Sequence, residues 1–328
     1  MKTRKLGDTD LEMTIIGFGT WAIGGGNWGM GWGDQDERDS IAAIHEGLDQ
    51  GINWIDTAHA YGFGESEEVV GKAVREYDGD VIVATKCGVL ANGDRSPYRL
   101  ISRKTIQEEV EGSLRRLQTD CIDLYQLHWP EPQENIEEGW QTLLDLKQQG
   151  KIRWAGVCNF YEENLNRAEI LGHISSIQPQ YSILDRRVEP GVMEWCRNKN
   201  TGFLGYSPMH SGLLTGKVSR EWYEGLPSND WRKHKQGHPV TQYLQEPHMN
   251  HFLVFVDELR SIAGESGHTV GQLAVSWVLS HSEVTSTIVG ARRPGQISET
   301  AQAADWELSS NELERIEKAY ADFLVKVG

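Results

Sequence analysis

Eight short apolar runs alternate with helix-like segments along almost the whole chain, and this alternation limits the possible folds most strongly. The runs are continuously apolar, which is typical of parallel strands buried on both faces. The strand-like runs are residues 14–18, 52–56, 80–85, 121–127, 152–157, 175–178, 202–206 and 286–289. The helix-like segments are residues 37–50, 65–76, 102–118, 135–149, 162–171, 190–199, 251–265 and 294–302. Eight strand–helix units close naturally into a barrel, so the sequence predicts one α/β domain, residues 1–328, with the (β/α)8 TIM-barrel fold.

Four segments depart from a bare barrel. Residues 3–13 predict a short hairpin that would cap the N-terminal end of the barrel, and residues 269–281 predict an extra helix before the eighth strand. Residues 207–250 form a long loop after the seventh strand, and a loop of that length in a compact domain is usually functional. A final helix, 309–324, lies close to the end of the chain, so we expect no C-terminal tail over the active site.

The charge balance argues against several classes of partner. The chain has 32 basic and 48 acidic residues, and its net charge of -16 disfavours nucleic acid and anionic membranes. No apolar run approaches the roughly 20 residues that span a bilayer, and the N-terminus lacks the apolar segment of a signal peptide. The cysteines are widely spaced without a CxxC pair, which favours reduced thiols in a cytoplasmic protein. They are Cys87, Cys121, Cys158 and Cys196.

Three of the predicted strands run into a residue that can take part in acid–base chemistry. Asp56 ends INWID, Lys86 ends VIVATK and His128 ends IDLYQLH, while Tyr61 lies in the loop just after Asp56. Barrel enzymes build their active sites where the strands run into the following loops. Each residue alone is often structural, but four of them at successive strand ends predict a proton-transfer site.

The roles of these four residues follow from their ordinary pKa values. A free tyrosine has a pKa near roughly 10, and a buried lysine cation beside Tyr61 would favour the phenolate and lower that pKa. Asp56 would keep Lys86 charged and fixed, and His128 could donate a hydrogen bond to a substrate carbonyl oxygen. Tyr61 would then be the general acid for reduction and the general base for oxidation.

The same segments resemble the aldo-keto reductase superfamily, in the expected order and over nearly the whole chain. The resemblance is closest to the bacterial branch of NADPH-dependent reductases associated with general stress and sugar metabolism. The matching motifs are GFGTWAIGG (17–25), DTAHAYGFGESEEVVGKA (56–73), ATK (84–86), RLQTDCIDLYQLHWP (116–130), GKIRWAGVCNF (150–160), IQPQYS (177–182), GLLTGK (212–217) and GARRPGQISET (290–300). The resemblance implies a (β/α)8 barrel and maps the family's catalytic tetrad onto the four residues chosen above.

None of the four residues can supply a hydride, so a nicotinamide cofactor is required. The resemblance implies that the cofactor lies extended across the C-terminal mouth of the barrel. Its expected contacts are Thr20, Trp21 and Asp56 at the nicotinamide ribose, Asn159 and Gln180 at the carboxamide, Tyr206 on the ring, Ser207, Gly212, Leu213 and Lys217 at the pyrophosphate, and Gly290, Arg292, Gln296, Glu299 and Thr300 at the adenosine end.

The adenosine end should decide between the two nicotinamide cofactors. Arg292 and Arg293 could bind a 2′-phosphate through forked, charge-assisted hydrogen bonds, which favours NADPH/NADP+, although Arg293 is expected to face solvent. The sequence departs from the family at two positions. Cys158 replaces the usual serine beside the carboxamide-binding asparagine, and Thr300 stands where asparagine is common. Sulfur is a weak hydrogen-bond partner, so the contact of Cys158 is expected to be weaker than that of serine. Both changes bear on cofactor affinity.

The loop 21–34 carries several tryptophans and many glycines. An aromatic pocket around the tetrad would suit flat aryl aldehydes and would also stack on sugar rings. Its expected members are Trp21, Trp28, Trp32 and Trp129. The alternative for Trp28 and Trp32 is that they pack the loop against the protein.

Three other patterns were weighed. The stretch from Gly17 to Ala22 matches GxGxxA, but no helix opens after it, so a Rossmann nucleotide site is disfavoured. The histidines of the long loop lack a tight ligand spacing, so no metal is expected. These are His234, His238, His248 and His251. Cys87 follows Lys86 and could be a reactive thiol, but such a cysteine is more often a small buried hydrophobe.

The leading hypothesis is an NADPH-dependent reductase of aldehydes and ketones. A sugar or polyol dehydrogenase working in the oxidative direction would use the same tetrad. A cofactor-binding regulatory subunit of a channel is the alternative from another class, and the complete tetrad argues against it. The expected partner is therefore a small carbonyl compound or sugar.

Overall fold

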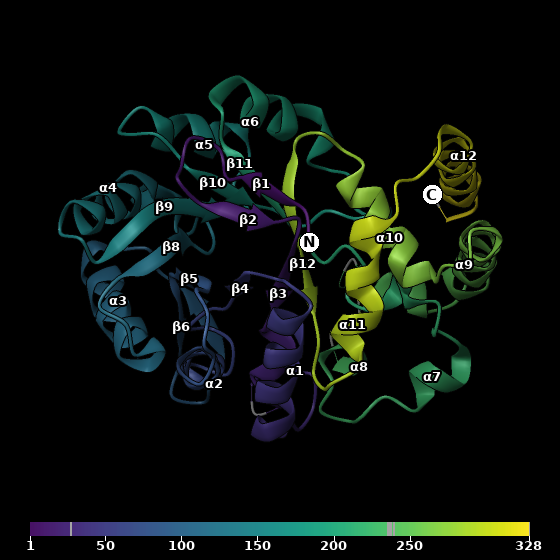
Figure 1. Ribbon diagram of the computed structural model, residues 1–328, viewed down its shortest axis with the longest axis horizontal. Helices are drawn as coiled ribbons and strands as arrows, with labels where there is room; N and C mark the ends of the chain where they lie inside the picture. Colours follow the sequence, from purple (N-terminus) through teal and green to yellow (C-terminus); the bar gives the residue numbers. More distant parts are fainter. Residues whose placement is uncertain (27, 235–237, 239, 328) are drawn as a thin grey trace.

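The computed structural model describes residues 1–26, 28–234, 238 and 240–327. Its centre is a closed barrel of eight parallel strands, each hydrogen-bonded to the next one in the chain (Figure 1). The barrel strands are β3 (Ile16–Gly19), β4 (Trp54–Asp56), β5 (Ile82–Cys87), β8 (Ile122–Leu127), β9 (Ile152–Cys158), β10 (Ser176–Gln178), β11 (Gly202–Tyr206) and β12 (Val284–Gly290). The predicted (β/α)8 fold is confirmed.

Helices surround the barrel and connect its strands. They are α1 (Glu37–Asp49), α2 (Glu65–Arg75), α3 (Arg103–Leu117), α4 (Ile136–Gln148), α5 (Glu162–Glu169), α6 (Glu194–Lys199), α7 (Arg220–Glu224), α8 (Trp231–His234), α9 (His248–Glu265), α10 (Val270–Leu279), α11 (Gln296–Ala301) and α12 (Ser310–Val327). Several begin at side chains that accept a free backbone N–H. Ser102 caps α3, and Thr269 and Gln272 form a capping box at α10.

The N-terminal end of the barrel is closed by the predicted hairpin. Strands β1 (Thr3–Lys5) and β2 (Glu12–Thr14) pair antiparallel. The apolar side chains of Leu6, Leu11 and Met13 are buried in one cluster with barrel residues that include Trp54. This apolar cluster fills the N-terminal end of the barrel. The predicted site residues are therefore expected at the opposite, C-terminal end, where barrel enzymes have their active sites.

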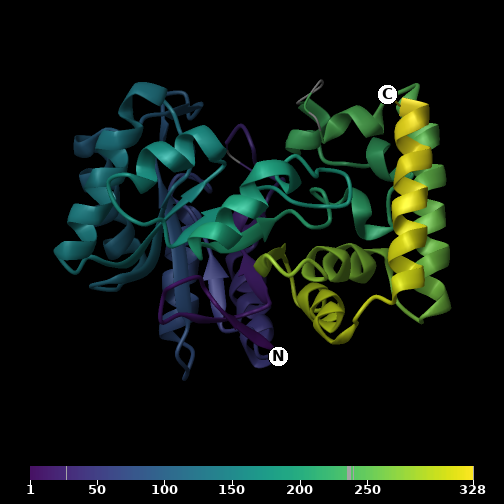
Figure 2. The ribbon, with the colours of Figure 1, turned by 90° about the horizontal axis from the view of Figure 1, so that it is seen from above.

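The two helices before β12 have the reverse of their expected roles. The segment 269–281, expected to be extra, forms α10, which is buried along its whole length and packs against β12. The segment expected to cover the barrel forms α9, which packs beside α12 at the edge of the molecule (Figure 2). The reason is composition, because α10 is apolar all round, whereas α9 and α12 each have a charged face.

The connections differ from the expectation in three further places. The long loop 207–250 contains the short helices α7 and α8, and α9 starts inside it at His248. A hairpin that the sequence did not predict, β6 (Val89–Ala91) with β7 (Pro97–Arg99), follows β5. The helix expected at 190–199 is regular only in α6, because Pro190 and Gly191 take non-helical backbone angles before it.

Candidate active site

The four predicted catalytic residues meet at the C-terminal mouth of the barrel. Lys86 Nζ lies 2.7 Å from each carboxylate oxygen of Asp56, 2.9 Å from the Thr57 carbonyl oxygen and 3.3 Å from the Tyr61 hydroxyl. The ring of His128 stands edge-on to the ring of Tyr61, with their centroids 5.9 Å apart. Strand β4 positions Asp56, β5 positions Lys86 and β8 ends just before His128, so neighbouring strands hold the site.

The lysine at the centre of this group is charged although it is buried. Burial alone would strongly lower the pKa of Lys86, but its neighbours together, with the Asp56 carboxylate first among them, raise the pKa above its ordinary value. Only 1% of the Lys86 side chain is exposed, so its ammonium cannot rely on water. The Asp56 carboxylate and the Thr57 carbonyl satisfy the three N–H donors instead, which fixes the ammonium beside the Tyr61 hydroxyl.

Tyr61 and His128 are both neutral in this environment. Burial raises the pKa of Tyr61, and the opposing effect of Lys86 is smaller, so the expected net lowering of that pKa is wrong. Burial, followed by the positive charges of Lys86 and Arg99, holds the pKa of His128 well below its usual value. A protonated tyrosine and a neutral imidazole can each donate one hydrogen bond into the mouth.

A glutamine that sequence reasoning missed completes the buried network. Gln178, at the end of β10, donates a hydrogen bond of 2.7 Å to the Asp56 carboxylate and is 2% exposed. On the other side, Thr20 donates to the Asp56 backbone carbonyl and accepts from Ser66. The position of Gln178 at the end of a barrel strand, like that of Asp56, was the signal that could have identified it.

The residues expected at the nicotinamide lie together at adjoining strand ends. Asn159 follows β9, and its amide donates to the His128 carbonyl oxygen over 3.0 Å and accepts from the Tyr206 hydroxyl over 3.0 Å. Gln180 follows β10 and pairs with Tyr206 at the end of β11. Cys158 is buried at the end of β9, and burial raises the pKa of its thiol. Trp21 opens a helical turn directly after Thr20.

The residues expected at the pyrophosphate and adenosine come from the loop after β11 and from the segment around α11. Ser207 and Gly212 both take left-handed backbone angles, and Leu213 is buried beside them. Lys217 is exposed and pairs with Glu299 across 3.7 Å, which joins the two segments. Gly290 ends β12, Gln296 begins α11 and accepts from the backbone N–H of Arg292, and Thr300 bonds to its own helix.

The guanidinium of Arg292 does not point freely into solvent. It donates to the backbone carbonyls of Trp32 and Asp34 and to the side chain of Gln35. These partners belong to the tryptophan loop, which we define as residues 21–26 and 28–36. Its neighbour Arg293 is exposed, as expected.

The four predicted pocket tryptophans divide into two groups. Trp28 lies 6.4 Å from the Tyr61 ring between centroids, and Trp129 packs in a small apolar cluster with Tyr61 beneath the Arg99 guanidinium. Trp21 and Trp32 instead pack on the rings of one another and of Trp231.

Trp32 therefore follows the alternative expectation, that it packs the loop against the protein, because its ring lies against those of Trp21 and Trp231. Trp28 and Trp129 remain beside the tetrad and line one side of the mouth.

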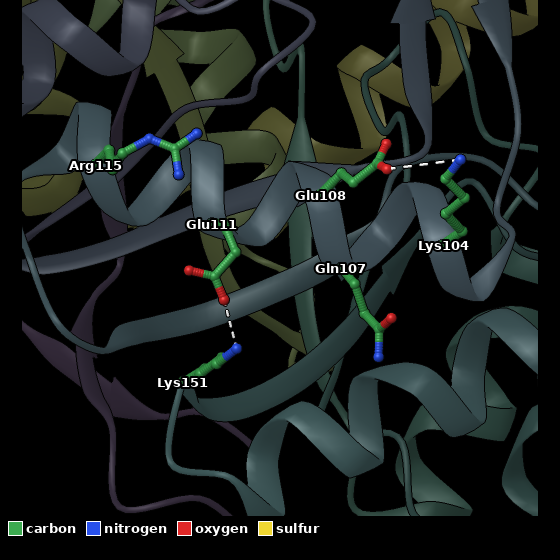
Figure 3. Close-up of a pocket in the computed structure, with 6 residues that line it drawn as sticks. All are labelled: Lys104, Gln107, Glu108, Glu111, Arg115 and Lys151. Atoms are coloured by element: carbon green, nitrogen blue, oxygen red, sulfur yellow. Dashed lines mark hydrogen bonds and ion pairs between the residues drawn. The ribbon is translucent and has the colours of Figure 1, made fainter.

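A second depression lies away from this site. A groove of about 530 Å³ follows the outer face of α3 and is lined by exposed charged side chains, in which Glu111 pairs with Lys151 and Glu108 with Lys104 (Figure 3). It contains none of the tetrad, and solvated ion pairs of this kind contribute little energy.

Within residues 1–26, 28–233, 238 and 240–327, no three His, Cys, Asp or Glu side chains gather in an arrangement for a metal ion. The side chain of His234 lies outside the described part. Across the same ranges, no helix combines the length and the apolar character that a membrane crossing needs.

The sequence and the fold resemble those of known proteins. The model of the Aldo/keto reductase family matches residues 15–321. Aldo-keto reductase YhdN of Bacillus subtilis is 40% identical over 316 residues, which cover 95% of this chain and 91% of the relative. The NADH-specific methylglyoxal reductase of Escherichia coli is 36% identical over 323 residues, which cover 94% of this chain and 95% of the relative.

A solved structure gives the same result. The glycerol dehydrogenase AKR11B4 of Gluconobacter oxydans superposes with a TM-score of 0.88 at 35% identity, covering 98% of this chain and 96% of that one. A family match over nearly the whole chain, together with full-length relatives at this identity, establishes that the chain belongs to the aldo/keto reductase family.

Proposed function

We propose that this oxidoreductase reduces small aldehydes and ketones to alcohols, with Tyr61 as the general acid. The observation that carries the proposal is the buried chain from Asp56 through the Lys86 ammonium to the Tyr61 hydroxyl, 3.3 Å from Lys86 Nζ. A charged lysine held at this distance stabilises the phenolate that forms when the proton leaves.

The residues of the mouth define the proton step. A substrate carbonyl oxygen would accept hydrogen bonds from the Tyr61 hydroxyl and from neutral His128. As negative charge develops on that oxygen, the Tyr61 proton moves to it, and the phenolate left behind faces Lys86. Asp56 holds the lysine in place, and Gln178 in turn holds the Asp56 carboxylate.

A nicotinamide cofactor, when bound, supplies the hydride. The side chains at the mouth suit this group chemically, because the amides of Asn159 and Gln180 match a carboxamide and the Tyr206 ring offers a face for stacking. We propose NADPH as the preferred cofactor, with the exposed Arg293 available to the 2′-phosphate. The Escherichia coli relative is named NADH-specific, so direct comparison of the two cofactors decides this point.

The opposite direction is the second candidate. The Gluconobacter structure is named a glycerol dehydrogenase, and the same tyrosine, deprotonated, would act as the general base for a polyol. Relative rates with aldehydes and with glycerol or sugars separate the two directions. The free cysteines fit the cytoplasmic location that we propose.

The decisive experiment compares the wild type with Tyr61→Phe, following oxidation of NADPH and of NADH with 4-nitrobenzaldehyde. We expect the variant to lose about 10²–10⁴-fold in kcat, the usual contribution of a general acid, while cofactor binding stays intact. Because burial raises the pKa of Tyr61, the acid stays protonated through neutral pH and the wild-type rate should show no loss there. Near-normal turnover by the variant would refute the proposed acid.

A further inference from the structure

Arg292 is bound to the tryptophan loop through nearly all of its side-chain donors. Its Nη1 lies 2.9 Å from the Trp32 carbonyl oxygen, and its Nη2 lies 2.6 Å from that of Asp34 and 3.5 Å from that of Gly33. Its Nε donates to the Gln35 side chain over 2.8 Å. A forked contact with a phosphate needs two adjacent free N–H groups, and these bonds leave only one of five.

Gln35 returns the interaction, so the contact is reciprocal. The Gln35 amide nitrogen donates to the Arg292 backbone carbonyl over 2.6 Å and to the Ser40 hydroxyl over 2.9 Å. The pair therefore ties the end of β12 to the tryptophan loop and to the first turn of α1. We call this pair, Gln35 with Arg292, the clasp.

The same loop is held from the other side by residues just before and within α8. The Trp231 backbone N–H donates to the Gly31 carbonyl oxygen over 3.0 Å, and the Asn229 amide donates to Asp34 over 3.2 Å. The Arg232 guanidinium lies 4.3 Å from the centre of the Trp32 ring. The second half of the loop, from Gly31 onward, is its far arm. It is held between the clasp on one side and the residues around α8 on the other.

Close glycine contacts connect this arm with the catalytic tyrosine. A Cβ on Gly31 would lie 2.7 Å from the Gly25 carbonyl oxygen, so the two arms of the loop touch through their backbones. A Cβ on Gly24 would lie 2.6 Å from the Tyr61 carbonyl carbon. Backbones packed this closely move together, because no side chain lies between them to absorb a displacement. Trp28, between these arms, faces the Tyr61 ring.

We propose that the clasp positions Trp28 against Tyr61, so that Arg292 is a positioning residue for the carbonyl substrate and does not read the cofactor 2′-phosphate. The inference rests on the proposed function for its substrate. It replaces the expected phosphate contact of Arg292 and leaves Arg293 as the other cation of that segment.

The test uses the full chain with Gln35→Met, Arg292→Met and Arg292→Lys, and with Arg38→Met as a control that removes an exposed cation from α1. Three quantities are measured: acrylamide quenching of tryptophan fluorescence, the Kd values for NADP+ and NAD+, and KM and kcat for 4-nitrobenzaldehyde. Quenching and binding need no turnover. Far-ultraviolet circular dichroism verifies that each variant is folded.

We expect Gln35→Met and both Arg292 variants to raise quenching and to raise the aldehyde KM about tenfold, with kcat changed by less than about twofold. Lysine cannot span the three carbonyls, so Arg292→Lys should behave like Arg292→Met. The ratio of the Kd values for NADP+ and NAD+ should stay constant. The gain in quenching should vanish in a Trp28→Phe background, because Trp28 is the residue released.

Two results would overturn the proposal. One is a selective loss of NADP+ affinity in Arg292→Met that Arg292→Lys restores, with Gln35→Met behaving like the wild type, because Arg292 would then read the phosphate. The other is unchanged quenching and KM in Gln35→Met. A wild type that reduces no aldehyde would overturn the proposed function instead, while the quenching and Kd ratio would still decide the role of the clasp.

Discussion

The centre of the barrel mouth is buried and its rim is partly exposed, and the two are built differently. At the centre, Asp56, Lys86 and Gln178 project from the ends of strands of one closed sheet. At the rim, Trp32 and Arg292 meet although 260 positions separate them in the sequence. The centre is positioned by the hydrogen-bonded barrel, whereas the rim is positioned by contacts between loops.

This difference shows how the molecule separates chemistry from recognition. The strands fix the proton-transfer groups before any substrate arrives, which is the arrangement that electrostatic catalysis needs. The loops around the mouth carry the residues for which we propose contacts with cofactor and substrate, and loops can change without disturbing the barrel. The comparison predicts large effects at the centre and small or local effects at the rim.

The largest effect is expected for Lys86→Met. The variant leaves the buried Asp56 carboxylate without its cation, and breaking a buried pair in this way usually costs about 3–5 kcal/mol of stability. Urea unfolding of the wild type and the variant measures the loss. The double variant Asp56→Leu/Lys86→Met should recover part of it. A loss below about 1 kcal/mol would show that the pair does not organise the centre.

An intermediate effect is expected for His210, which is buried at the rim and hydrogen-bonded to Ser182 over 3.0 Å. Burial lowers the pKa of His210 from 6.5 to about 4. Between these two pH values the unfolded chain binds a proton at His210 that the folded chain does not. The contribution of His210 to the free energy of unfolding is therefore complete above pH 6.5. It falls as the pH drops below that value, by up to roughly 1.4 kcal/mol per pH unit. His210→Asn should flatten this part of the profile in pH-dependent unfolding. If the free energy of unfolding depended on pH equally in both proteins, His210 would be exposed to water in the folded state.

The smallest effect is expected for Lys217→Met. Lys217 pairs with Glu299 across 3.7 Å, but its side chain is 69% exposed, so water and salt screen the pair. The variant should change the free energy of unfolding by less than about 0.5 kcal/mol, and Glu299→Gln should match it. A larger change measured by urea unfolding would mean that the rim contributes to global stability as the centre does.

The sequence predicted the centre well because its residues occupy positions that the fold itself defines. Asp56, Lys86 and His128 end apolar strands, so knowing the barrel was enough to bring them together. Gln178 was missed although, like Asp56, it ends a barrel strand, because its strand Ser176–Gln178 is short and mostly polar. The direction of the pKa shift of Tyr61 was wrong because the sequence indicates which cation is near but not how deeply the hydroxyl is buried from water.

The sequence by itself determined the barrel, the hairpin under it and the four residues of the proposed proton-transfer site. Local apolar periodicity and the order of strand ends carry that information, and both can be read from neighbouring residues. Only the tertiary structure decided that α10 and not α9 covers the barrel, and that Arg292 grips the tryptophan loop. These outcomes depend on which surfaces meet across long sequence separations, and many such pairings are compatible with the same local pattern.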